Sequence, residues 1–259
     1  MSTRWWGPGQ DATHQTEPVA CIFCQRTKKL SREHLWPQWV LGLIEKESRP
    51  GNVPHSIEPH DRDPRRFLAP LFSATLKAVC EDCNNGWMSD IEAEAKPYAA
   101  PLITGEEGQL LDLDAQWALA RWAYLKVLLL ERVDKRQRLL PPDRYRVLYD
   151  SLDDPVLPST ASIFIAAHDG DLYGQYQHRG LTRRGGSKVE LFVGTFTVGH
   201  LVLQVIENVS GDPRAISPER EKEIAGHDER IWLFRPPFTW PPGLALTDSG
   251  LAVFAGPTP

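Results

Sequence analysis

The chain lacks an excess of positive charge, a long uninterrupted apolar run, and any cysteine outside two short pairs. Its net charge is −5, so any contact with nucleic acid must come from a local basic patch rather than from overall basicity. The most apolar stretch, Trp117 to Leu130, is interrupted by Arg121 and Lys126 and is too short to span a bilayer. Met1 to Gly9 contain no basic segment followed by an apolar run, which predicts no secretory signal. We therefore expect a cytoplasmic globular protein with no membrane segment.

Length and composition set the domain organisation that we expect. A chain of 259 residues can form one large or two modest domains. Residues 1–18 are polar and rich in Gly, Pro and Thr, so we interpret them as a loose lead-in. Residues 19–105 hold every cysteine and predict a small metal-bound module. Residues 106–259 carry no motif that translates into chemistry and predict an α+β domain of unassigned role.

Periodicity predicts helices in the first half of the chain and strands in the second. Helices are expected at 38–47, at 84–96 with Pro97 ending the helix, at 115–133 capped by Asp114, and from Pro141 to Tyr149. The proline-rich segment 48–64 is interpreted as an inserted loop. Strands are expected at 162–168, 172–177, 188–193, 196–207 and 231–234, with a hairpin turn at Asp169-Gly170. The expected class is α+β: a zinc-stapled module, a helical connector and a mainly antiparallel α+β domain.

Two C-x-x-C pairs account for all four cysteines: Cys21 with Cys24, and Cys80 with Cys83. A two-residue spacer lets two thiolates meet one ion at tetrahedral angles, and Zn²⁺ prefers four soft ligands in closed structural sites. The alternatives are a redox dithiol or ordinary buried thiols. We interpret the four cysteines as a structural zinc site, which can contribute on the order of 10 kcal/mol to folding.

Polar residues with catalytic potential lie next to these pairs. Glu33 and His34 stand between the pairs, and Asn84 follows the last cysteine directly. Cleaving a phosphodiester with water needs a base and a cation that offsets charge on the phosphate. Histidine has a suitable pKa for the base, and a carboxylate with an amide oxygen suits Mg²⁺. A zinc site that holds Cys83 near the first pair would bring all three together.

This order of motifs resembles the HNH endonuclease family of the ββα-metal fold. C-x-x-C is followed by Glu-His-x-x-Pro and then by a second C-x-x-C that continues as NNGWMS, over about residues 19–98. The resemblance implies hydrolysis of DNA phosphodiester bonds with one divalent cation, Mg²⁺ or Mn²⁺. It assigns the general base to His34 and the ligands of the catalytic cation to Glu33 and Asn84.

Three departures from the family pattern stand in this sequence. The middle asparagine, which orients the base in the family, has no counterpart, and its place falls near Thr75. The segment from His34 to Cys80 is longer than in the family, and Trp87 replaces a basic residue that often follows the metal ligand. These departures keep a second hypothesis open: a catalytically impaired zinc-bound module that binds DNA or a protein.

Basic residues flank the proposed site and are the expected contacts to a DNA backbone. The alternative is that these residues form an ordinary solvated surface. The set comprises Arg26, Lys28, Lys29, Arg32, Arg65 and Arg66.

The C-terminal domain offers a third hypothesis, in which it senses a ligand or pairs two chains and the nuclease module acts as its effector. The apolar strand expected at 196–207 could pair across a homodimer.

Overall fold

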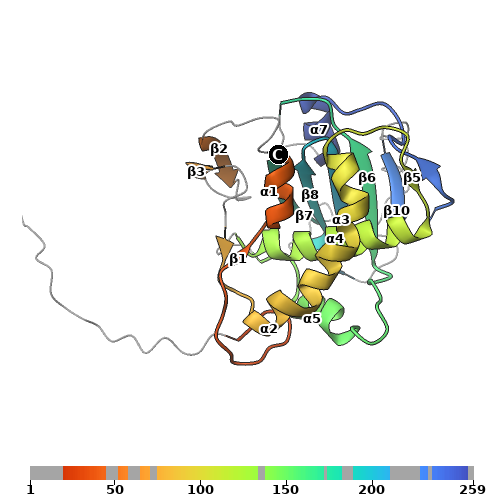
Figure 1. The fold of residues 1–259 in the computed structure, drawn as a ribbon. Coiled ribbons are helices and arrows are strands. Elements are labelled where there is room, and N and C mark those ends of the chain that lie inside the picture. The colour runs from red at the N-terminus through yellow and green to blue at the C-terminus, as the bar shows by residue number, and fades with distance from the viewer. Residues whose placement is uncertain are drawn as a thin grey trace, which may run out of the picture.

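A computed structural model describes residues 20–44, 52–57, 65–70, 75–133, 138–171, 174–182, 189–210, 228–232 and 235–255. The expected lead-in, residues 1–18, lies outside these ranges. The described part is a mixed helical and antiparallel-sheet structure, which confirms the α+β class (Figure 1).

The largest sheet has five antiparallel strands in the order β10-β6-β9-β8-β7. Their bounds are β6 Ala161–Ala167, β7 Gly174–Thr182, β8 Val189–Val198, β9 Leu201–Asn208 and β10 Asp228–Trp232. β10, which corresponds to the strand expected at 231–234, closes one edge of the sheet. Every residue of β9 is buried, as expected for a central strand covered on both faces.

Two predictions about this sheet are wrong. The strand expected at 196–207 is interrupted by a turn at Gly199, whose φ of 56° allows the chain to reverse between β8 and β9. β6 and β7 do not form a hairpin around Asp169-Gly170, because β6 pairs with β9 and β10 while β7 pairs with β8. β9 therefore has a partner on each side and offers no free edge for the strand pairing that we considered for a homodimer.

Helix α4, Leu113–Glu131, packs along one face of the sheet. Asp112 caps it, since its carboxylate accepts the backbone N–H of Ala115 at 2.9 Å. The prediction that Asp114 is the cap is therefore wrong by two residues. Helix α7, Asp248–Ala255, covers the opposite face of the sheet through Leu251 and Phe254. The result is a layered arrangement of α7, sheet and α4 (Figure 1).

Helix α3, Ser89–Ile103, packs against the other side of α4 and continues through Pro97 and Pro101. The prediction that Pro97 ends the helix is wrong. Proline has no backbone N–H, so Pro97 cannot donate a hydrogen bond to the carbonyl of Ala93. Both residues are exposed, so water can satisfy that carbonyl. The buried stripe of α3 comprises Ile91, Ala95, Ala99, Leu102 and Ile103.

Short elements complete the N-terminal region. Strand β1, Glu33–His34, pairs with β4, Thr75–Leu76, and helix α1, Gln38–Ile44, begins where expected after Pro37. Strand β2, Asn52–Ile57, pairs with β3, Arg65–Pro70, so the segment predicted as a plain loop contains one strand of a hairpin. Helix α2, Glu81–Cys83, and a π-helical turn, Asn84–Met88, lead into α3.

Three short elements, α5, β5 and β11, complete the described fold. Helix α5 spans Pro142–Asp150 and starts at the expected prolines. Strand β11, Phe238–Thr239, pairs with β5, Leu110–Leu111, and the adjacent Trp240 is buried.

One apolar core runs through both halves of the chain. The same cluster of buried residues contains the cysteines, the buried face of α3, most of α4 and the α4-facing side of the sheet. No helix in the described ranges is both long enough and apolar enough to traverse a bilayer.

Candidate metal centre and adjoining polar site

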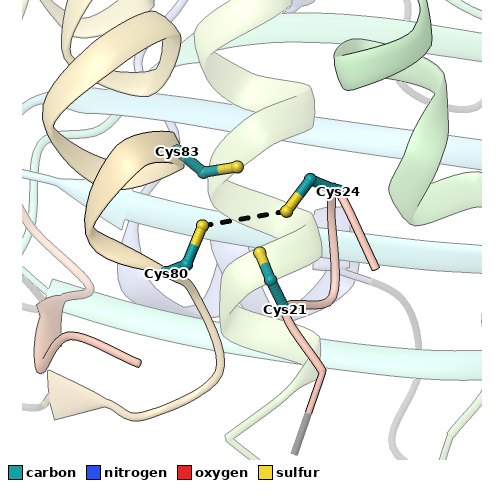
Figure 2. Close-up of side chains that lie close together, drawn as sticks. All are labelled: Cys21, Cys24, Cys80 and Cys83. Carbon is teal, nitrogen blue, oxygen red and sulfur yellow. Dashed lines mark hydrogen bonds between the residues drawn. The ribbon is translucent and has the colours of Figure 1, made fainter. Parts of the chain in front are cut away.

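The four cysteines converge on one point, although the two pairs are far apart in the sequence. The sulfur atoms of Cys21, Cys24, Cys80 and Cys83 all lie within 4.8 Å of one another, and all four residues are buried. Cys24 and Cys80, 56 positions apart, have sulfurs 3.7 Å from each other. Figure 2 shows one pair on the N-terminal loop and the other at the start of α2, with the sulfurs facing a common centre. No disulfide joins them. This group could hold a metal such as zinc.

Backbone hydrogen bonds hold the two cysteine pairs against each other. The N–H of Ile22 donates to the carbonyl of Ala78 at 3.0 Å, and the N–H of Ser31 donates to the carbonyl of Val79 at 2.8 Å. Gln25 turns the chain after Cys24 with a φ of 56°. The tight loop at Cys21–Cys24 thus lies directly beside the segment that enters α2.

The environment of the thiols differs from one cysteine to another. Burial raises the pKa of Cys83 and Cys24. Burial acts the same way on Cys21, but backbone N–H groups of Cys80, Cys24 and Phe23 donate to its sulfur, and together they hold the pKa of Cys21 below its usual value. Buried sulfur ligands that are supported by backbone N–H groups suit a metal ion bound by thiolates. The positive charge of such an ion would favour deprotonation of the thiols.

Aromatic side chains pack beside the cysteine group. Trp87 lies edge-on to Phe23, which stands between the first two cysteines, with ring centroids 5.1 Å apart. It also approaches Tyr149 of α5 at 6.5 Å. Trp87, which stands where the HNH pattern often has a basic residue, therefore has a packing role here.

Glu33 and Asn84, which are far apart in the sequence, lie close together beside the cysteine group. Asn84 follows Cys83 in the π-helical turn, while Glu33 lies on β1. The Asn84 side chain hydrogen-bonds to the carboxylate of Glu33, a residue that is only 6% exposed. Burial raises the pKa of Glu33 to about 7; the ammonium of Lys126 opposes that rise and the carboxylate of Glu92 adds to it. The hydrogen bond from Asn84 also opposes that rise in the pKa of Glu33.

A buried ion pair adjoins Glu33. Lys126 of α4 is 0% exposed, and its ammonium bonds to Glu92 of α3. Two carboxylates, Glu33 and Glu92, thus lie near one ammonium. If both carboxylates are ionised, one negative charge is left uncompensated, and a proton or a further cation would balance it.

His34 lies beside this cluster but does not join it. It follows Glu33 on β1, where successive side chains point to opposite faces, and it is exposed while Glu33 is buried. Across the β1–β4 ladder His34 pairs with Thr75. No hydrogen bond connects His34 to Glu33 or Asn84, all three of which the structure describes. In the ranges covered, the four cysteines form the only group of three or more His, Cys, Asp and Glu side chains with metal-binding spacing.

The predicted DNA-contacting residues fall into three groups. Lys28 bonds to Asp82, and Lys29 pairs with Glu81 at 2.8 Å, so these lysines tie the first cysteine loop to α2. Arg26 and Arg32 are exposed, and neither forms an ion pair with a residue of the described ranges. Arg65 and Arg66 open strand β3, and the structure describes their backbone only.

Sequence reasoning did not single out Glu92 or Lys126. The sequence does contain a sign of this ion pair, because Lys126 interrupts the apolar run of α4, a helix that is buried on nearly all sides. A lysine is almost never fully buried without a partner, so its position already predicted a buried anion.

No family model, curated protein sequence or solved structure matches this chain.

Proposed function

We propose that the chain is a metal-dependent endonuclease of the HNH type that hydrolyses DNA phosphodiester bonds. The observation that supports it most is the contact between Glu33 and Asn84, a buried carboxylate and an amide from distant parts of the chain. Both are hard oxygen donors of the kind that Mg²⁺ or Mn²⁺ takes in phosphate-cleaving sites. His34, which is exposed, follows Glu33 on β1, and Asn84 directly follows Cys83 of the four-cysteine group.

Each residue has a separate role in the proposed reaction. His34 takes a proton from water, the water oxygen forms the new bond to phosphorus, and the ester P–O bond breaks. The leaving oxygen takes its proton from solvent. Glu33 and Asn84 would hold the divalent cation, and the cation would supply positive charge to offset the negative charge that builds up on the phosphate and the leaving oxygen. Thr75, opposite His34 on β4, supports the strand that carries the base.

The cysteine centre has a structural role in this proposal. Zinc held by Cys21, Cys24, Cys80 and Cys83 would fix the start of α2 against the N-terminal loop. Asn84 follows the last of these ligands directly, so its placement beside β1 depends on that anchor. When Glu33 and Glu92 are both ionised, they carry one negative charge more than Lys126 balances, and this supports the binding of a second, harder cation.

A plasmid-nicking assay tests this proposal. The wild-type protein should convert supercoiled plasmid to nicked or linear DNA with Mg²⁺ or Mn²⁺ and stop when EDTA is added. His34→Ala should lower the rate at least about 100-fold, since a general base contributes about 10²–10⁴-fold. Gln38→Ala, an exposed neighbour at the start of α1, is the matched control and should cut normally. Equal cleavage by wild type and His34→Ala, at equal zinc content and melting temperature, would refute the assignment.

A second function, binding without cleavage, is favoured by one specific observation. Thr75 pairs with His34 at the place where the family has an asparagine, and a hydroxyl orients an imidazole less firmly than an amide can. In that case the wild-type protein would shift labelled duplex DNA in a gel without nicking it under any divalent cation. The same gel with single-stranded RNA distinguishes a DNA ligand from an RNA ligand.

A further inference from the structure

Lys126 presents a physical problem for the proposed cation site. Its ammonium is fully buried on α4, and its charge acts on the carboxylate of Glu33 as well as on that of Glu92. A buried ammonium gains most from direct contact with a carboxylate, because no water solvates either group. If Lys126 paired with Glu33, it would occupy the carboxylate that the divalent cation needs.

In the structure Lys126 pairs with Glu92 instead. The ammonium bonds to a carboxylate oxygen of Glu92, while Glu33 takes its hydrogen bond from Asn84. Glu92 is 18% exposed and lies on the face of α3 that meets α4. Glu33 and Glu92 thus compete for one ammonium, and Glu92 holds it.

We propose that Glu92 is a positioning residue of the cation site: it retains the Lys126 ammonium and so keeps Glu33 available to a divalent cation. The inference rests on the proposed function, because it concerns the same site. It also links that site to the second half of the chain, since α4 supplies the ammonium. Residues 19–105 alone would lack this part of the site.

A second ion pair between the same helices provides a matched control. Arg121 of α4 bonds to Glu94 of α3 at 2.6 Å, and the Glu94 side chain is 52% exposed. This pair joins α3 to α4 as Lys126–Glu92 does, but it lies five residues earlier on α4 and two residues later on α3. Removing it should affect packing of the two helices without affecting the cation.

Mn²⁺ binding, measured by electron paramagnetic resonance of the free ion, tests the proposal on the full-length zinc-loaded protein. Glu92→Gln should weaken Mn²⁺ binding at least about tenfold, within the range found for residues that support metal ligands. Adding Lys126→Met to Glu92→Gln removes the competing ammonium and should restore affinity to near the wild-type value. The double variant also avoids leaving an unpaired buried charge, so it should fold. Glu94→Gln with Arg121→Met should bind Mn²⁺ as the wild type does.

The outcomes separate this inference from the proposed function. Wild-type affinity in Glu92→Gln would overturn it, and so would a double variant that stays weak, since Glu92 would then bind the cation itself. If Glu33→Gln binds Mn²⁺ as tightly as the wild type, the proposed cation site is wrong instead. A crystal structure of zinc-loaded Glu92→Gln without Mn²⁺ then still tests the inference, which requires the Lys126 ammonium within hydrogen-bonding distance of Glu33. An ammonium that remains beside residue 92 would contradict it.

Discussion

Replacing Cys80 with serine should remove zinc and destabilise the entire described fold. Cys80 is almost fully buried, and its sulfur is 3.7 Å from that of Cys24. It is also the N-cap residue of α2, the helix that leads to Asn84. A serine oxygen is a harder and weaker ligand for zinc than a thiolate, so the variant would leave an incomplete site.

The expected magnitude follows from the size of a structural zinc contribution. Four thiolates can supply about 10 kcal/mol, while a whole domain has a free energy of unfolding of only about 5–15 kcal/mol. The cysteines belong to the same core cluster as α4 and one face of the sheet, so the loss cannot be confined to the N-terminal loop. Losing even half of the contribution should lower the melting temperature by roughly 10 °C or more, at about 2–4 °C per kcal/mol for a protein of this size.

Zinc content by mass spectrometry and urea unfolding by tryptophan fluorescence measure this prediction. Val79→Thr is the control, because Val79 is the fully buried neighbour of Cys80. Its new hydroxyl should cost about 1–3 kcal/mol without removing zinc. One zinc per chain in Cys80→Ser, or an unchanged unfolding midpoint after zinc is lost, would refute the structural role of the metal.

Two further predictions concern the scaffold, and denaturant unfolding checks both. Gly199→Ala should destabilise the protein by at least about 2 kcal/mol, because φ is 56° and a new Cβ would overlap the Ile103 carbonyl oxygen. The control is Gly42→Ala in α1, where the space around the glycine is open. It should be neutral or stabilising by up to about 1 kcal/mol. Asp112→Ala should cost about 1 kcal/mol through loss of the α4 cap, whereas Asp114→Ala should change stability much less. Equal losses at Asp112 and Asp114 would contradict the capping assignment.

The cysteine centre was predictable from sequence because its chemistry is local. A two-residue spacer fixes how two thiolates meet one ion, and no other cysteine competes for pairing. The starts of α1 and α5 were predictable for a similar reason, since Pro37, Pro141 and Pro142 suit the first turn of a helix.

Features that depend on tertiary surroundings were not predictable in the same way. Pro97 normally ends a helix, but in α3 it faces solvent while the opposite face packs on α4. The apolar pattern from Phe196 to Glu207 does not reveal the turn at Gly199, because both flanking strands are buried on both faces. In such segments, apolar character continues through the strand and gives no alternation to interpret.

The polar site contains residues that the sequence identifies and residues that only the tertiary packing reveals. Glu33, His34 and Asn84 were identified from motif and resemblance, and the structure brings Glu33 and Asn84 into contact. Glu92 and Lys126 come from helices that the motif does not cover, and only the packing of α3 on α4 places them beside Glu33.

Anomalous diffraction from crystals soaked in Mn²⁺ tests the central claim, which is that a zinc centre assembles a separate site for a harder cation. Data at the zinc and manganese absorption edges should give two distinct peaks. The zinc peak should lie about 2.3 Å from each of the four cysteine sulfurs. The manganese peak should lie within roughly 2.0–2.3 Å of oxygens from Glu33 and Asn84. A manganese peak only at other surface carboxylates, with none at Glu33 and Asn84, would contradict the account.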